Sequence, residues 1–131
     1  MTRKKVRSII MLLFILVILF IVWRRDISIM DDVQANEISK ITMYDSSTHI
    51  EVTDKEDISK IVNLIQSMEL NHAIPKGKEG YAFSINICYK NGEESIITVR
   101  STDIVVDGTY YESSNDYCGD FQQLYNEFES R

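Results

Sequence analysis

The 131-residue sequence is poor in the residues that build metal centres and disulfide scaffolds, with two histidines, two cysteines, one tryptophan and one proline. No HExxH, CxxC or EF-hand pattern occurs, and neither His49 nor His72 stands at metal-ligand spacing from Cys, Asp or Glu. A glycine-rich phosphate loop and a GxSxG elbow are also absent. We therefore expect no metal ion, no cofactor and no catalytic residue, and we predict that the protein is not an enzyme.

Two weaker chemical signals have structural explanations. Cys118 lies near a predicted helix start, where a thiolate would be stabilised, but no histidine is close in sequence to act as its base. The carboxylates of Asp54, Glu56 and Asp57 cluster in sequence, and capping of a helix accounts for all three.

The first 25 residues contain no acidic side chain and include one unbroken apolar run, Ile9–Trp23 (IIMLLFILVILFIVW). As a helix this run covers about 22 Å, which is short for a bilayer core of about 30 Å. Val6 and Ser8 can extend the helix, and the flanking arginines can extend their charges toward the headgroups. We therefore predict a transmembrane signal anchor over residues 9–25, with Trp23 at the membrane interface.

The basic residues around this run predict its orientation. Four precede it, and two follow it, Arg24 and Arg25. By the positive-inside rule, residues 1–8 form a basic cytoplasmic tail and the rest of the chain lies outside the cytoplasm, so we expect a single-pass protein of the cell membrane.

The same pattern is also typical of a cleaved signal peptide. The only small-residue cleavage motif is Val33-Gln34-Ala35, ten residues beyond Trp23 and across several charged residues. No cysteine stands near the run, which excludes a lipoprotein anchor. We favour an uncleaved signal anchor.

Residues 26–131 hold all twenty acidic residues against eight of the fourteen basic ones, a formal charge of −12. This charge repels nucleic acid and anionic lipid, so we expect no nucleic-acid partner. A basic partner is compatible with it, although acidity also simply favours solubility. The length suits one small domain, residues 37–131, preceded by a linker over residues 26–36.

The two cysteines, Cys88 and Cys118, could form a disulfide in an oxidising compartment, which would stabilise the domain by about 3–4 kcal/mol. Against this pairing, Cys88 falls on the polar side of its predicted strand, whereas Cys118 lies near a helix that packs on the apolar side. Both states stay open at the level of sequence.

Alternation and turn residues predict six strands. A first hairpin, Glu37–Tyr44 with Thr48–Thr53, directs Ile50 and Val52 to one face, with Ile41 and Met43 as the matching pair on the first strand. Further strands are predicted at Tyr81–Lys90, Glu94–Arg100, Asp103–Val106 and Thr109–Glu112, with type I′ chemistry at Asn91-Gly92 and a favoured Asp107-Gly108 turn. The aspartate-glycine turn explains Asp107 better than a calcium site with Asp103 does.

Helical spacing predicts two amphipathic helices. The first starts with a capping box, Thr53 as N-cap and Glu56 at the third helical position, and is followed by a loop over Asn71–Gly80. The second is capped by Asn115 or Asp116. The apolar positions are Ile58, Ile61, Val62, Leu64, Ile65 and Met68 in the first helix, and Tyr117, Phe121, Leu124, Tyr125 and Phe128 in the second. The order ββαββββα predicts a two-layer α+β domain, an antiparallel sheet with both helices on one face.

The uncovered face of this sheet is the candidate binding face. Tyr110 and Tyr111 are consecutive on a strand, so they point to opposite faces, and one of them should face away from the helices. Beside Ser84, Asn86 and Thr98, such a tyrosine would offer apolar area with a polar tip.

The run from Ile38 to about Phe128, with VTDKEDISKIVNLI, GYAFSINICYKNG and a terminal aromatic helix, resembles small extracytoplasmic domains of unknown function in Gram-positive Firmicutes. This resemblance implies attachment by an N-terminal lipid or a single helix and no assigned catalytic residues. Because this chain lacks the lipobox cysteine, the resemblance implies a helix-anchored member.

These observations favour a membrane-anchored extracytoplasmic binding or accessory module that contacts a protein or peptide of the cell envelope. One alternative is a small envelope hydrolase or metal-dependent enzyme, which would need titratable groups clustered around a histidine. A second alternative is a sensory module read out through the short basic tail.

Overall fold

The computed structural model describes residues 2–23, 28–74 and 82–130. The expected positions of Arg24, Arg25 and Tyr81 lie outside these ranges. The elements are α1 (Arg3–Trp23), η1 (Ala35–Glu37), β1 (Ile38–Asp45), β2 (Thr48–Val52), α2 (Lys55–Ser67), β3 (Asn71–His72), β4 (Phe83–Tyr89), β5 (Glu94–Arg100), β6 (Asp103–Val106), β7 (Thr109–Glu112) and α3 (Cys118–Glu129).

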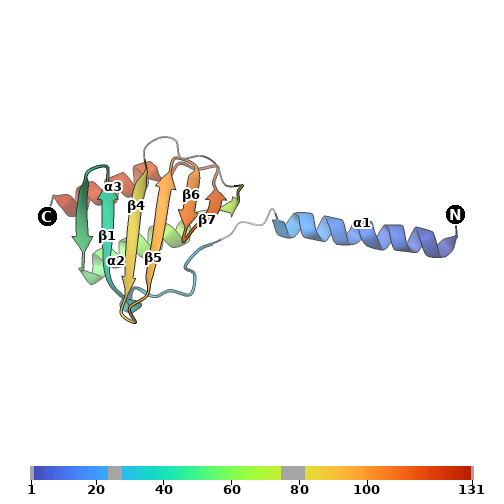
Figure 1. Cartoon of the computed structure of the whole chain (residues 1–131), viewed down its shortest axis with the longest axis horizontal. Helices are drawn as coiled ribbons and strands as arrows, with labels where there is room; N and C mark the ends of the chain where they lie inside the picture. Colours follow the sequence, from blue (N-terminus) through green and yellow to red (C-terminus); the bar gives the residue numbers. More distant parts are fainter. Residues whose placement is uncertain (1, 24–27, 75–81, 131) are drawn as a thin grey trace.

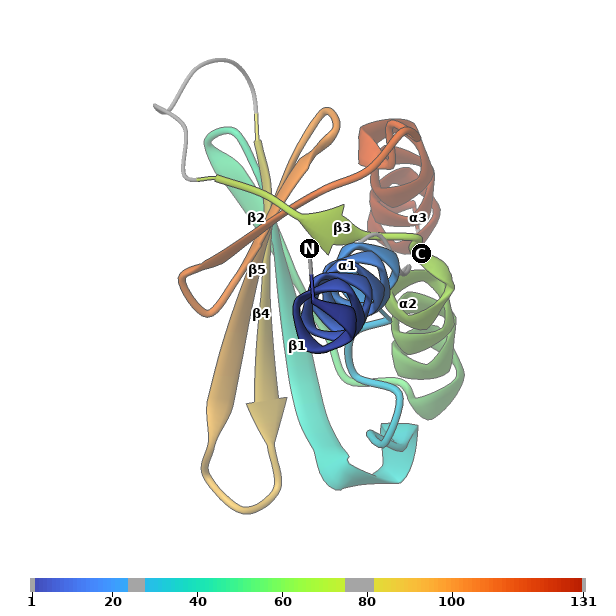
Figure 2. The ribbon, with the colours of Figure 1, turned by 90° about the vertical axis from the view of Figure 1, so that its right-hand side faces the viewer.

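The part of the chain that follows α1 is an α+β domain, as predicted. Its seven strands form one antiparallel sheet in the order β2-β1-β4-β5-β6-β7-β3 (Figure 1). Helices α2 and α3 lie side by side on one face of this sheet (Figure 2). In the first hairpin Ile41 pairs with Val52 and Met43 with Ile50, so the predicted apolar pairs of the two strands meet on one face.

The core lies between the sheet and these two helices, because alternate strand residues and one stripe of each helix are apolar. Its fully buried side chains come from both layers: Ile41, Met43, Phe83, Ile85, Ile87, Ile97, Val99 and Ile104 from strands, and Ile61, Ile65, Phe121 and Tyr125 from helices. Leu64, Leu124 and Phe128 are only partly buried at its margin. The predicted helical stripes are thus the ones that pack.

One two-residue strand, β3, was not predicted. Asn71 and His72 fall at the start of the expected loop Asn71–Gly80, and they pair with Glu112 and Tyr111 of β7. The pairing continues through Ala73, whose N–H donates to the carbonyl of Tyr110 (3.2 Å). A strand of two residues has no alternation that a sequence pattern could show.

The two predicted glycine turns differ in the structure. Asp107 and Gly108 both have positive φ (49° and 86°), which a type I′ turn requires. At Asn91-Gly92 only Gly92 has positive φ (93°), so the type I′ prediction there is wrong. The Tyr89 N–H donates to the Glu93 carbonyl (2.9 Å), and the loop therefore has three residues with glycine in the left-handed position.

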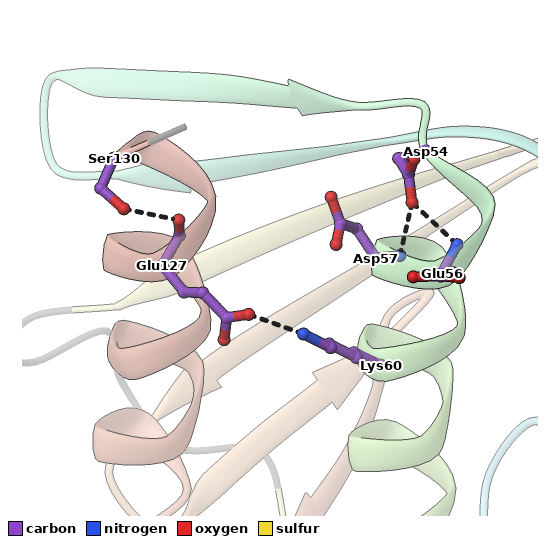
Figure 3. Close-up of polar contacts among 6 residues, drawn as sticks. All are labelled: Asp54, Glu56, Asp57, Lys60, Glu127 and Ser130. Carbon is purple, nitrogen blue, oxygen red and sulfur yellow. Dashed lines mark hydrogen bonds and ion pairs between the residues drawn. The ribbon is translucent and has the colours of Figure 1, made fainter.

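Helix α2 begins one residue later than its capping box predicted. Asp54, not Thr53, is the N-cap, and its Oδ1 accepts from the N–H groups of Glu56 (2.9 Å) and Asp57 (3.2 Å) (Figure 3). At α3 the N-cap residue is Tyr117, which makes no side-chain cap bond. The neighbouring Asp116 accepts from the Cys118 N–H instead (2.9 Å).

The expected linker is part of the domain over the residues that the structure describes. Ile29 is buried, and Val33 and Ala35 pack against the core. The side chain of Gln66, near the end of α2, donates to the carbonyls of Met30 (2.7 Å) and Val33 (3.0 Å). Residues 29–35 of the predicted linker therefore pack against the domain.

Helix α1 has 21 residues, because it extends the apolar run back to Arg3. Its length is about 31 Å, close to the thickness of a bilayer core. Residues Arg3–Val22 form one segment that is long and apolar enough to cross a membrane, and none of its surface is buried against the rest of the chain. Such a helix near the N-terminus is compatible with a membrane anchor or with a signal sequence.

We expect Asp54→Ala to lower the free energy of unfolding by about 1 kcal/mol, because it leaves two amide groups at the start of α2 without their acceptor. Thr53→Ala is the matched control and should change stability by less than about 0.5 kcal/mol. Urea unfolding of the full chain in detergent measures both. A larger loss for Thr53→Ala would return the cap to the position that the sequence predicted.

We expect Gln66→Leu to loosen residues 29–35 without unfolding the sheet, because it removes both hydrogen bonds that the side-chain amide donates to this segment. The Val33 N–H, which donates to Met30 (3.0 Å), should exchange with solvent about tenfold faster. Hydrogen exchange of the full chain measures this rate, with Gln123→Leu on the exposed side of α3 as the control. Unchanged exchange at Val33 would show that Ile29 alone holds the segment.

Candidate functional site

The candidate site is the face of the sheet that the helices leave uncovered. Strand register aligns its side chains in rows across the sheet. One row runs from the β2 edge to β7: His49, Tyr44, Ser84, Thr98, Val105 and Tyr110. The row beside it contains Glu51, Thr42, Asn86 and Ile96. Small hydroxyl residues thus form the floor of the face and aromatic residues lie toward its two sides.

The centre of this face holds an amide with an unused acceptor. Thr42, Asn86 and Ile96 are neighbours on β1, β4 and β5. The Oδ1 atom of Asn86 is shielded from solvent and accepts no hydrogen bond from any described group. A shielded acceptor without a donor costs free energy, so native proteins rarely keep one.

Two large apolar side chains stand exposed around this amide. Ile96 is 50% exposed and Tyr44 is 41% exposed, although both lie in the middle strands of the sheet. The ring of Tyr44 leans on the ring of His49, with centroids 5.6 Å apart. Exposed apolar groups around a polar centre are typical of surfaces that bind another molecule.

Of the predicted binding residues, Ser84, Asn86 and Tyr110 share the open face, and Tyr111 does not. Ser84 and Tyr110 belong to one row, three strands apart, or about 14 Å. Tyr110 is partly buried beside a small hollow that Ala73, Ile74 and Arg100 also line.

Tyr111 points to the helix side, because consecutive strand residues point to opposite faces and Tyr110 lies on the open face. Its ring stacks on His72 at a centroid distance of 6.1 Å and packs against the core. The prediction that one of the two tyrosines faces away from the helices is confirmed, and Tyr111 has to be removed from the candidate face.

Charges on the open face are mixed and solvated. Lys40 and Glu51 form an ion pair across β1 and β2 (3.4 Å) with both side chains about half exposed. Such a pair contributes little to stability, roughly 0–1 kcal/mol. The face therefore offers both signs of charge at its β2 side rather than one strong field.

The two cysteines are free thiols at opposite ends of β5. Cys88 lies opposite Glu94 at the start of this strand. Cys118 lies at its end, where its Sγ accepts from the Ser101 N–H (3.1 Å) and donates to the Val99 carbonyl (3.6 Å). The separation along the strand is about 16 Å, far beyond the reach of a disulfide. The Cys88–Cys118 disulfide is not formed in this fold.

The environment of Cys118 opposes a nucleophilic role. Burial raises the pKa of its thiol above the ordinary value, and the neighbouring carboxylate of Asp116 adds to this rise, although the hydrogen bond from Ser101 works against it. A nucleophilic cysteine needs the opposite shift, toward the thiolate.

The two histidines lie on different sides of the molecule. His49 is on the open face at the β2 edge, and His72 is on the helix side at the β3 edge. Within residues 2–23, 28–74 and 82–130, no three His, Cys, Asp or Glu side chains are grouped so that they could hold a metal ion. The calcium alternative fails on geometry as well, because Asp103 and Asp107 lie at opposite ends of β6 and Asp107 binds the Ile96 amide (2.8 Å).

Comparison with protein-family models, with characterised proteins and with solved structures found no match to this chain.

Sequence reasoning missed the most exposed members of the site, Tyr44 and Ile96. The signal was present, because Tyr44 alternates with the buried Ile41 and Met43, and Ile96 occupies a polar position between Ser95 and the buried Ile97. An apolar residue at a solvent-facing position of a strand is the pattern that would have found both.

We expect the full chain to contain two free thiols and no internal disulfide under non-oxidising purification. We also expect Cys118 to react with iodoacetamide more slowly at pH 8 than a short-peptide thiol, because its raised pKa reduces the thiolate fraction. Mass spectrometry of the alkylated peptides measures both, with Cys118→Ser to identify the signal. Alkylation of Cys118 at the peptide rate would contradict the buried thiol, and a disulfide would contradict the fold.

Proposed function

We propose that this protein is a membrane-anchored extracytoplasmic binding or accessory module, which contacts a protein or peptide of the cell envelope through the open face of its sheet. The observation that carries the proposal is the shielded, unpartnered Oδ1 of Asn86 between the exposed side chains of Ile96 and Tyr44. A partner that donates a hydrogen bond to Asn86 and covers these two side chains would relieve both costs at once.

The anchor supports the location. Four basic residues precede the apolar part of α1, which favours a cytoplasmic N-terminus and an exported domain. The docking of residues 29–35 supports an uncleaved chain, because cleavage after Ala35 would remove Ile29 and Val33 from the core. The acidic domain then stays close to the membrane surface.

The enzyme and sensor alternatives have less support. A metal-dependent hydrolase would need titratable groups clustered around a histidine, and within the described residues no three His, Cys, Asp or Glu side chains are grouped to hold a metal ion. A sensor would need a partner that reads the eight-residue tail, and nothing in the domain points to one.

The test is crosslinking on intact cells that express the tagged full-length chain, followed by mass spectrometry of what co-purifies. One dominant envelope partner is expected. Tyr44→Ala and Asn86→Val should each reduce its recovery about fivefold to thirtyfold, because central interface residues contribute about 1–2 kcal/mol. Asn63→Val on the exposed side of α2 is the matched control and should leave recovery unchanged.

Stability separates a binding role from a folding defect. Asn86→Val removes an acceptor that has no donor and adds a residue that favours strands, so the free energy of unfolding should stay equal or rise. A variant that is at least as stable and yet loses the partner would support a binding role for Asn86. Recovery of no specific partner, or recovery that Asn86→Val leaves unchanged, would refute the proposal.

A further inference from the structure

The β2 edge of the sheet is an open strand. β2 is five residues long, contains no proline or bulge, and pairs only with β1. His49 and Glu51 are exposed on it and Ile50 is half-buried. A regular exposed edge is a template for another strand unless charge, proline or a covering element blocks it.

The hairpin register defines which backbone groups this edge offers. Asp45 and Thr48 pair across a two-residue loop, and such a loop closes on a hydrogen-bonded pair. Hydrogen-bonded and non-bonded pairs alternate from there, so Ile50 and Val52 direct their N–H and C=O groups toward β1. His49 and Glu51 direct theirs outward. Among the described residues, no backbone group from outside the β1–β2 ladder bonds to either.

These outward groups are self-complementary in one antiparallel register. When two β2 strands pair with Ile50 opposite Ile50, His49 of each copy lies opposite Glu51 of the other. Both residues direct their backbone N–H and C=O groups outward, so each of the two His49–Glu51 pairs forms two hydrogen bonds. This register therefore forms four backbone hydrogen bonds across the twofold axis. It also places each imidazole beside a carboxylate on the open face and brings the two Ile50 side chains together on the helix side.

The helix layer is compatible with this pairing. The C-terminal end of α3 and the N-terminal end of α2 lie under opposite ends of β2 (Figure 3). The Lys60–Glu127 ion pair (2.6 Å) joins these two helices within one copy. An antiparallel twofold places the end of each α3 near the start of the other copy's α2, where the helix dipoles have opposite sign.

We propose that a second copy of this chain binds along the β2 edge, in the register centred on Ile50, so that two sheets join into one of fourteen strands. The interface is isologous and closes as a dimer. The opposite edge, β3, has only two residues, which offers too short a ladder for head-to-tail growth.

The anchor permits this arrangement within one membrane. The docked segment enters beside Gln66 at the end of α2, on the side of the domain away from the β2 edge (Figure 1). The six residues that follow Trp23 span at most about 20 Å, which exceeds the spacing of about 10 Å between the sheet and helix layers. This length is therefore enough for two copies anchored in one membrane to meet at their β2 edges. Confinement to one surface also raises the effective concentration of the copies.

The test uses the full-length chain in membranes, with Cys88→Ser and Cys118→Ser as background. Ile50→Cys should form a disulfide-linked dimer, because directly opposed, non-bonded strand residues have Cα atoms about 4.5 Å apart. Ile96→Cys is the control, since Ile96 is exposed (50%) but lies in the middle of the sheet. We expect at least about tenfold more dimer for Ile50→Cys.

A backbone test keeps the result independent of the new cysteine. His49→Pro added to Ile50→Cys removes two of the four intermolecular donors while leaving the β1–β2 ladder intact, and should lower the dimer yield about tenfold or more. His49→Ala keeps the N–H and should retain most of the dimer. A dimer that survives His49→Pro, crosslinks of Ile50→Cys to another protein only, or equal yields at positions 50 and 96 would overturn the proposal.

Discussion

The structure depends on the burial of one face of the sheet beneath two helices. The alternate strand residues Ile41, Phe83 and Ile97 meet the stripes of α2 and α3, and this packing provides most of the stabilisation a domain of this size can have. Because the helices cover only one face, the other face stays open and polar and the β2 edge stays uncovered. The two cysteines are not joined by a disulfide. A domain that needs only one face for stability keeps the other available for recognition.

The attachment of the domain to α1 is part of the same core. Ile29 contributes a side chain to it, and Gln66 holds the backbone of the entering segment at two points. The packed part of the domain consequently begins at Ile29, only six residues after the end of α1. The open face is therefore joined by a short stretch of chain to the helix that is long and apolar enough to cross a membrane.

Local patterns predicted most of the fold, and non-local contacts account for what they missed. Alternation in Phe83–Tyr89 and helical spacing in Lys55–Ser67 are strong because each element buries one side. Asp54 and Thr53 are adjacent and both can cap a helix, so the geometry of the chain decides between them. The docking of Ile29 follows no period, because it depends on contacts with core residues that are distant in the sequence. The open face and the exposure of Ile96 could be anticipated from alternation, but which of Tyr110 and Tyr111 lies on that face depended on the register between β6 and β7.

The docked segment also determines how the molecule responds to load. A pull on α1 enters the domain at its first packed residues, so the contacts of Ile29 and Gln66 bear the tension before any strand does. These contacts are few and can be peeled away one at a time, whereas the sheet would have to be sheared as a unit. Release of these contacts would lengthen the free chain between α1 and β1 by about 30 Å and would leave the open face intact. If α1 were pulled away from the folded domain, this segment would therefore detach before the sheet unfolds.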